Sequence, residues 1–362
     1  MPLSRVNPDN YQHELNEKAD KIAKQFHAFN IPPIDVFNSP PRHYRMRAEF
    51  RVWHENDVCF YAMFKKEDPK TPCRITNFDI GSERICQLMP LLLDEINKSE
   101  LLKQRLFQIE FLTTLSNQAL VTLIYHKKLD EVWEGLAKLL QEKYDINIIG
   151  RSRKQRLVLA NDFVTETLTV NNKEYLFQQV ENSFTQPNAV VNQKMLQWAL
   201  LNSKPNGADL LELYCGNGNF TTILAQNFEQ VLCTEISKTS VKSANVNFAQ
   251  NSIENVSVAR MSSEEISAAL NDEREFRRLK DIDIAAYNFS SVLVDPPRAG
   301  LDKKTEELIN QFDHILYISC NPNTLHDNLV TLCKTHAVEK FAVFDQFPYT
   351  DHIECGVTLK RK

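Results

Sequence analysis

The stretch DLLELYCGNGNF, residues 209 to 220, decides the fold, because an apolar strand pattern runs directly into a glycine loop. Gly216 and Gly218 let the backbone turn tightly and approach a ligand closely. From here onward, strand-like and helix-like segments alternate, and a β pair closes the chain. This alternation predicts a parallel, doubly wound α/β sheet that binds its ligands at the carboxyl ends of the strands.

The glycine loop also limits the choice of cofactor. Thr221 stands three residues after Gly218, where the dinucleotide-binding pattern requires a third glycine, so an NAD enzyme is disfavoured. Glu235 closes the next strand, and an acid in that place can accept both hydroxyls of a ribose. These residues favour an adenosyl ligand without a pyrophosphate, and S-adenosylmethionine is the better candidate.

Two further strand ends carry reactive side chains. The stretch HILYISCNPNTL, residues 314 to 325, lifts Cys320 out of a buried strand onto a loop, where it is either a nucleophile or a small buried hydrophobe. In SSVLVDPPR, Asp295 ends a strand and two prolines fix the chain beyond it. The same pattern is expected of a structural turn that ends a strand and has no functional role. Arg298 stands where amine-directed methyltransferases usually carry an aromatic residue, which argues against that chemistry and suggests a phosphate or base contact.

Composition gives a weaker but consistent signal. The 362 residues are 43% hydrophobic and 25% charged, as in ordinary globular proteins, and are enough for two domains. The net charge is −5, but residues 1–180 carry 25 Lys and Arg against 24 Asp and Glu, whereas residues 181–362 carry 17 against 23. The runs PRHYRMRAEFR and GRSRKQR lie in the first half and can neutralise phosphates, although a solvated charged face is the plainer alternative.

The first half reads as a separate α+β unit. An amphipathic helix over residues 9–29 would bury Leu15, Ile22 and Phe26. Short strands, a hairpin over residues 106–128, a helix and further strands then follow, the last two turning at Asn171-Asn172. The helix over residues 129–144 is expected to bury one stripe of side chains, namely Val132, Leu136, Leu139 and Leu140. We expect one domain in residues 1–178 and a second in residues 179–362.

Several classes of protein are disfavoured. The N-terminal residues lack the apolar core of a signal peptide, and no apolar run approaches the length of a spanning helix. The eight cysteines form no CxxC pair, so neither a zinc site nor an iron–sulfur cluster is indicated. We expect a cytoplasmic protein with free thiols, no metal, no membrane contact and no obligate protein partner.

Three motifs taken together, DPPR, SCNPNT and FPYTDHIEC, resemble those of the RNA uracil-5-methyltransferases. The likeness extends to QVENSFTQPN and LELYCGNGNF, and HYRMRAEFR is similar to the tRNA (uracil-5-)-methyltransferases of the TrmA type. It covers nearly the whole chain. The sister group that modifies ribosomal RNA commonly carries an N-terminal β-barrel module and a four-cysteine cluster, and this sequence has neither, which supports the tRNA members.

The resemblance implies a Rossmann-like S-adenosylmethionine-dependent methyltransferase domain behind an N-terminal α+β RNA-binding domain. The implied substrate is the uridine at position 54 in the T-loop of tRNA, with the T-arm of transfer-messenger RNA as a further target. Cys320 would be the nucleophile and Glu354 the general base. The cofactor and target pocket would be lined by Gln186, Tyr214, Asn219, Glu235 and Asp295.

The resemblance also suggests RNA contacts at Arg51 and Phe107. For Phe107, core packing is the default, because it shares a strand face with Ile109 and Phe111 in a regular strand. Glu354 alone would read as a strand-end acid that faces water.

The chemistry needs a thiol and a base together, because carbon 5 of uracil is too weak a nucleophile to take a methyl group directly. A thiolate that adds to carbon 6 turns the ring into an enolate, and a base must later remove the proton from carbon 5. Two alternatives stay open. One is an RNA cytosine-5-methyltransferase, which would carry a second cysteine in the DPPR motif, and the other is a non-catalytic RNA-binding or RNA-folding protein.

Overall fold

The computed structural model describes the chain over residues 6–65, 67–203 and 208–362. The chain forms two compact units, neither of which is continuous in sequence. The first unit is built mainly of Pro40–Thr167 and Gln178–Ala189, and the second of Asp9–Ser39, Leu168–Phe177 and Val190–Lys362. The N-terminal helix and residues 168–177 group with the second unit, whereas residues 178–189 group with the first.

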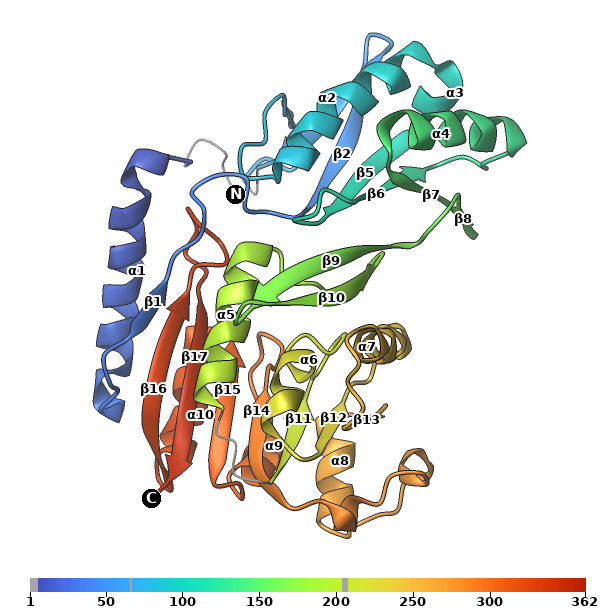
Figure 1. Ribbon diagram of the computed structural model, residues 1–362. Helices are drawn as coiled ribbons and strands as arrows, with labels where there is room; N and C mark the ends of the chain where they lie inside the picture. Colours follow the sequence, from blue (N-terminus) through green and yellow to red (C-terminus); the bar gives the residue numbers. More distant parts are fainter. Residues whose placement is uncertain (1–5, 66, 204–207) are drawn as a thin grey trace. The chain divides into compact units, whose positions relative to one another are not determined.

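An eight-stranded sheet forms the centre of the second unit, in the order β1-β16-β17-β15-β14-β11-β12-β13 (Figure 1). Its strands pair in parallel except at β17, which is antiparallel to both of its neighbours. The predicted doubly wound α/β fold is therefore confirmed. The strands are β1 (Asp35–Phe37), β11 (Asp209–Leu213), β12 (Val231–Thr234), β13 (Val256–Ala259), β14 (Phe289–Val294), β15 (His314–Ser319), β16 (His336–Phe344) and β17 (Glu354–Arg361).

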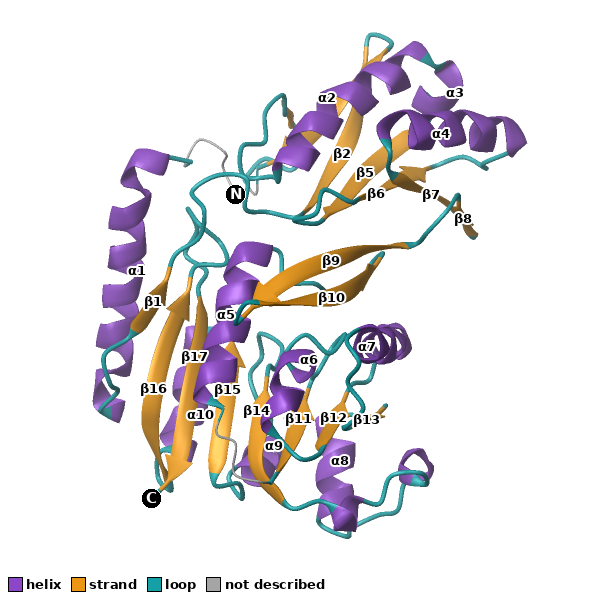
Figure 2. Ribbon diagram, viewed as in Figure 1, coloured by secondary structure: helices purple, strands orange, loops and turns teal. Residues whose placement is uncertain are grey.

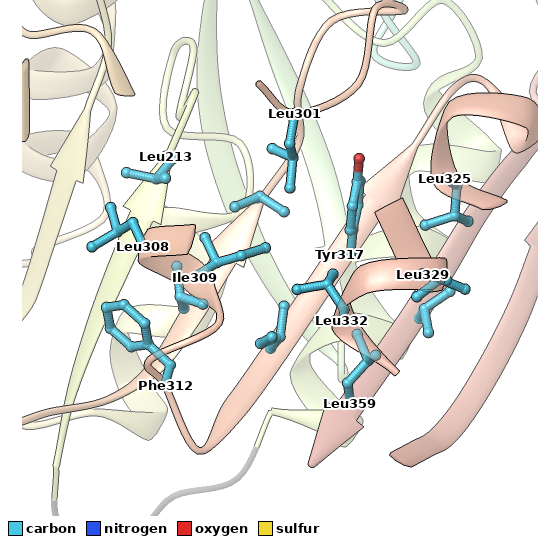
Figure 3. Close-up of a cluster of buried hydrophobic side chains, with 14 of the residues drawn as sticks. Leu213, Leu301, Leu308, Ile309, Phe312, Tyr317, Leu325, Leu329, Leu332 and Leu359 are labelled. Carbon is cyan, nitrogen blue, oxygen red and sulfur yellow. The ribbon is translucent and has the colours of Figure 1, made fainter. Parts of the chain in front are cut away.

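Helices cover both faces of this sheet (Figure 2). One face packs into a single hydrophobic cluster with α1 (Tyr11–Phe26), α8 (Ser263–Leu270), α9 (Lys303–Ile309) and α10 (Pro322–Leu332). Figure 3 shows part of this cluster, in which Leu325, Leu329 and Leu332 of α10 lie three and four residues apart, as one helix face requires. The other face carries α5 (Ala189–Asn202), α6 (Thr221–Leu224) and α7 (Lys238–Gln250).

The helix predicted at the N-terminus is confirmed as α1, and its side chains Leu15, Ile22 and Phe26 are buried. The ring centroid of Phe26 lies 5.0 Å from that of Phe341 in β16, which fixes the helix against the second unit's own sheet. The sequence gives no sign of β1, because prolines flank it and obscure the strand pattern. It is an edge strand, where neighbouring prolines remove no ladder hydrogen bond.

The first unit has a seven-stranded sheet in the order β4-β3-β2-β5-β6-β7-β8. Only β6 and β7 pair in parallel. Its strands are β2 (Arg47–Glu55), β3 (Val58–Phe64), β4 (Pro72–Arg74), β5 (Leu106–Thr113), β6 (Ala119–Tyr125), β7 (Asn147–Ser152) and β8 (Gln155–Val158). Its helices are α2 (Glu83–Lys98), α3 (Glu100–Lys103) and α4 (Glu131–Tyr144).

The predicted helix α4 forms, but the stripe expected to be buried is wrong in part. Val132 and Leu139 are 59% and 62% exposed, whereas Leu140 is buried as predicted, together with Trp133 and Ala137. The reason lies at Gly150 in β7, where a Cβ atom would approach the Trp133 ring to 2.2 Å. The glycine leaves room for the indole, and burial of that large ring sets the rotation of the helix.

A two-stranded hairpin, β9 (Phe163–Val170) and β10 (Lys173–Val180), joins segments that belong to both units. The turn predicted at Asn171-Asn172 is confirmed, with φ values of 51° and 62°. Two positive φ values are typical of a type I′ turn, which asparagine tolerates better than most residues.

Candidate active site

Three adjacent strands of the second unit bring a thiol and two carboxyl groups to one edge of the sheet. Ser319 at the end of β15 pairs with Cys355 of the antiparallel β17. Cys320 follows Ser319 and Glu354 precedes Cys355, so the two residues lie close together where β15 ends and β17 begins, and the charge of Glu354 acts on the Cys320 thiol. Asp295 follows β14, which runs parallel to β15 on its other side, so it reaches the same edge.

Burial raises the pKa of each of these groups, and repulsion by neighbouring carboxyl groups adds to the rise for Glu354 and Cys320. Burial, and then the nearby carboxyl of Asp295, raise the pKa of Glu354 to about 8, while Arg298 acts in the opposite direction. Burial raises the pKa of Asp295 to about 7. Two carboxyl groups with such values near neutral pH can hold or release a proton, which is the property that acid–base catalysis requires.

The thiol of Cys320 is half-buried, and its pKa is raised to about 11 by burial and then by Glu354 and Asp295. A nearby cation or backbone N–H donors would lower the pKa of such a thiol. Arg298 does act in that direction, but burial outweighs it. The thiol is therefore protonated at neutral pH in the free protein, and the Glu354 carboxyl lies close to it.

The loop after Cys320 is tied to the loop after Asp295. Asn321 caps α10 by accepting a hydrogen bond from the Asn323 N–H, and its Nδ2 donates to the Arg298 carbonyl at 2.9 Å. Pro322 occupies the first turn of that helix, where no N–H is needed. The sequence CNPNT thus fixes Cys320 immediately before a helix N-terminus and links it to the DPPR loop.

Helix α1 holds both the loop after Cys320 and the segment before Glu354, which the sequence did not reveal. Gln25 Nε2 donates to Asn323 Oδ1 at 3.0 Å, beside the cysteine loop. Lys18 Nζ donates to Asp345 Oδ1 at 2.7 Å and to the Phe347 carbonyl at 3.1 Å, in the segment that leads to Glu354. These two residues lie seven apart, hence on one face of the helix, and each fixes one loop.

The glycine loop after β11 is bound to the end of β12. The Gly216 N–H donates to Glu235 Oε2 at 3.1 Å, and the Ser237 N–H donates to Glu235 Oε1 at 2.7 Å. The Asn219 amide exchanges two hydrogen bonds of 2.9 Å with the Asn192 amide of α5. The second unit therefore positions the acid and the loop together.

A pocket of about 380 Å³ opens at this edge, within the size range of small-molecule sites. Tyr214 lines it in a left-handed conformation with φ of 62°, and its hydroxyl donates to Ser263 Oγ at 2.7 Å. Ile236 is 69% exposed beside Glu235, so an apolar surface adjoins a carboxylate. The other lining residues are Thr234, Met261, Ser262, Glu264, Pro297, Ala299, Gly300, Leu301 and Asp302.

Replacing Gly218 with alanine is expected to lower the free energy of unfolding by about 1–3 kcal/mol. Its φ is 78°, and a Cβ atom would lie 2.7 Å from the Phe248 ring of α7. Gly135→Ala is the matched control, because nothing lies within 4 Å of its Cβ position and it sits inside α4. That change should stabilise by about 0.5–1 kcal/mol. Denaturant unfolding checks both, and equal stability of the two variants would contradict the packing argument.

In the first unit, Arg51 and Phe107 form a stack with His126. The Arg51 guanidinium carbon lies 3.6 Å from the Phe107 ring centre, and the His126 ring stacks on Phe107 at 4.0 Å between centroids. Phe107 is half-buried, so it is not packed fully into the core as strand parity would predict. A register shift between Leu106 and Gln108 breaks the alternation, so Phe107 does not follow the buried Ile109 inward.

Gln186 also belongs to the first unit, in its segment Gln178–Ala189, and is half-buried. Apart from Gln186, Arg51 and Phe107, the residues that the sequence singled out lie in the second unit, at one edge of its sheet. They are Tyr214, Gly216, Gly218, Asn219, Glu235, Asp295, Arg298, Cys320 and Glu354. Sequence reasoning missed His126 and Ile236. Only their positions, next to Phe107 and next to Glu235, could have indicated them.

Over the described ranges of the chain, His, Cys, Asp and Glu form no group of three or more that could bind a metal ion. Over the same ranges, no helix combines the length and the apolar character needed to cross a bilayer. All eight cysteines are free thiols.

Comparisons with known proteins give the family of the chain. Residues 10–362 match the family model described as tRNA (Uracil-5-)-methyltransferase. A tRNA/tmRNA (uracil-C(5))-methyltransferase of Saccharophagus degradans is 55% identical over 361 residues, covering 99% of both chains. One of the same name from Cellvibrio japonicus is 56% identical over 352 residues, covering 97% of this chain and 96% of its own.

A solved structure shares the fold. The Pyrococcus abyssi tRNA (uracil-54, C5)-methyltransferase in complex with S-adenosyl-L-homocysteine superposes with a TM-score of 0.73. The match covers 97% of this chain and 83% of that one at 19% sequence identity. At this low sequence identity, the match shows a common fold and no more.

Proposed function

The chain belongs to the tRNA (uracil-5-)-methyltransferase family and is an RNA methyltransferase, and we propose that it methylates carbon 5 of uridine 54 in the T-loop of tRNA. The methyl donor is S-adenosylmethionine. The T-arm of transfer-messenger RNA is a second substrate, because it would present the same kind of loop. The reaction takes place in the cytoplasm, where these RNAs are found. The closeness of Cys320 and Glu354, at the neighbouring ends of β15 and β17, carries this proposal.

The second unit has the groups that an adenosyl ligand needs. Glu235 presents a carboxylate at the end of β12 for the ribose hydroxyls, and Ile236 offers an apolar surface beside it for the base. Gly216 and Gly218 keep the loop free of side chains at the point of closest approach. Bound there, S-adenosylmethionine supplies an electrophilic methyl group.

Cys320 and Glu354 divide the work of activating the uracil. The Cys320 thiol first loses its proton to solvent. Its sulfur then bonds to carbon 6, and the electrons of the C5–C6 double bond move toward the carbonyl oxygen on carbon 4. Carbon 5 then takes the methyl group as an enolate carbon, and the donor would leave as S-adenosylhomocysteine. Glu354 removes the remaining proton from carbon 5, the double bond re-forms, and the C6–S bond breaks. Cys320 is released as a thiolate, and the proton from carbon 5 leaves through Glu354.

Turnover is expected to rise about tenfold between pH 7 and pH 9, because the base form of Glu354 is required. Its pKa is raised to about 8, so the carboxyl is protonated below that pH and ionised above it. Deprotonation of Cys320, with its pKa raised to about 11, acts in the same direction at higher pH. Rates measured with saturating RNA check this, and a profile that is flat through pH 8 would contradict the assigned base.

On the RNA side, the stack of Arg51, Phe107 and His126 supports binding of an unpaired loop. Base–aromatic stacking stabilises single-stranded RNA by about 1–3 kcal/mol per base, and His126 is exposed on one side of this stack. The target uridine must leave its stacked position to reach Cys320, which costs a few kcal/mol. Stacking of neighbouring bases on this aromatic group offsets that cost.

The proposal is tested with methyl-labelled S-adenosylmethionine and unmodified tRNA, followed by digestion to nucleosides. Label in 5-methyluridine at position 54 is expected. Label in 5-methylcytidine would support the cytosine alternative instead, and no label would leave the RNA-folding alternative. The family comparison favours uracil, and the DPPR loop lacks a second cysteine.

A further inference from the structure

The first unit has a basic groove that the reaction at Cys320 does not use. It has a volume of about 790 Å³ and lies where the parallel strands β6 and β7 diverge beyond their last pair, Ile124 and Arg151. Two segments, residues 124–128 and 151–155, form its walls. Five cationic side chains line it, together with His126: Lys127, Lys128, Arg151, Arg153 and Lys154.

Three of these cations are available for a ligand. Lys128, Arg153 and Lys154 are exposed, and within the described parts of the chain none of them makes a hydrogen bond or ion pair. Lys127 is less free, since its Nζ donates to the Leu101 carbonyl at 2.6 Å and Asp130 lies close enough to interact with its charge. Arg151 is held by the Glu181 carboxylate, with Nε–Oε1 at 2.5 Å.

The walls of the groove are fixed before any ligand binds. Gln155 bridges them, because its Oε1 accepts from the Leu129 N–H at 3.0 Å and its Nε2 donates to the Leu129 carbonyl at 3.1 Å. Glu181 accepts from both Arg151 and Arg156 and so ties β7 to β8. A preorganised groove loses little entropy when it binds a charged ligand.

The tip of the β7–β8 hairpin gives independent support. Lys154 has a φ of 64°, a conformation that favours glycine or asparagine over lysine. A lysine at such a position is strained. Its side chain lines the groove.

We propose that this groove binds the sugar–phosphate backbone of the RNA next to the bases held by the aromatic stack. His126 both lines the groove and stacks on Phe107, so the two surfaces are continuous. Cations without fixed partners suit phosphates, and phosphate contacts position an RNA without reading its sequence. The inference rests on the proposed function, because it takes the RNA substrate as the ligand.

The test compares the triple variant Lys128→Gln, Arg153→Gln, Lys154→Gln with wild type by titrating tRNA at several salt concentrations. A plot of log K against log salt has a negative slope, and each lost phosphate contact should make that slope less steep by about 0.7–0.9. Affinity near 0.1 M salt should fall at least about tenfold. The loss should be equal for tRNA with uridine 54 and for tRNA with cytidine there. The matched control, Lys98→Gln, Lys138→Gln, Lys143→Gln, removes the same charge from ion pairs on α2 and α4 and should change neither quantity.

Lys154→Asn serves as a second variant, because asparagine tolerates the positive φ and the fold is kept while one charge is lost. It should lower the salt slope by about 0.7–0.9. Wild-type affinity and slope in both groove variants would overturn the inference, as would a loss confined to RNA with uridine 54 or an equal loss in the control. If wild type labels no tRNA at all, the proposed function fails instead, so the two failures are distinct.

Discussion

Cys320→Ala is expected to lower turnover by at least about 10⁴-fold and to abolish any covalent link between protein and RNA. Without the sulfur, carbon 6 receives no electron pair, and carbon 5 stays too weak a nucleophile to take the methyl group. The neighbouring thiol of Cys355, which lies in β17, cannot replace it, because Cys355 is fully buried within the sheet. Binding of S-adenosylmethionine should persist, since Cys320 does not line its pocket.

The matched control is Cys333→Ala, which removes a half-buried thiol from the opposite end of α10. It should keep turnover within a few-fold of wild type. Denaturing gels of the protein with labelled tRNA detect the adduct, and single-turnover methylation gives the rate. Cys320 would not be the nucleophile if the alanine variant still formed an adduct, or if it methylated tRNA at a rate comparable to wild type.

The pairing of Cys320 with Glu354 shows where sequence reasoning reaches its limit. Each residue was marked by local pattern, the one at the end of an apolar run and the other in the motif FPYTDHIEC. That they lie close together depends on β17 inserting antiparallel between β15 and β16. Strand order of this kind is a non-local property, and no local propensity specifies it.

Helix α1 and Phe107 show two other limits. The apolar stripe of α1 predicts a helix and its buried face, but a stripe does not name its partner, and this one packs within the second unit. For Phe107, the alternation of side chains along the strand predicted burial, but a register shift beside this residue leaves its ring half-buried. In both cases the local structure followed from the sequence, whereas the contact that matters for function did not.

Glu354→Gln is expected to let the RNA adduct accumulate while turnover falls by about 10²–10⁴-fold. Glutamine keeps the size of the side chain at a position only 5% exposed, but it cannot accept the proton from carbon 5. Attack by Cys320 and methyl transfer precede that step, so the methylated ring stays bound through the C6–S bond. The variant should also lose the rise in turnover near pH 8.

The control for charge is Asp351→Asn, which neutralises an exposed acid three residues earlier in the chain. It should leave turnover near the wild-type value and form no lasting adduct. A matching defect in this variant would point to a proton relay through the exposed segment rather than direct abstraction by Glu354. Normal turnover in Glu354→Gln would show that another group is the base. Asp295 would then be the next candidate, because its carboxyl reaches the same sheet edge and its pKa is raised to about 7 by burial.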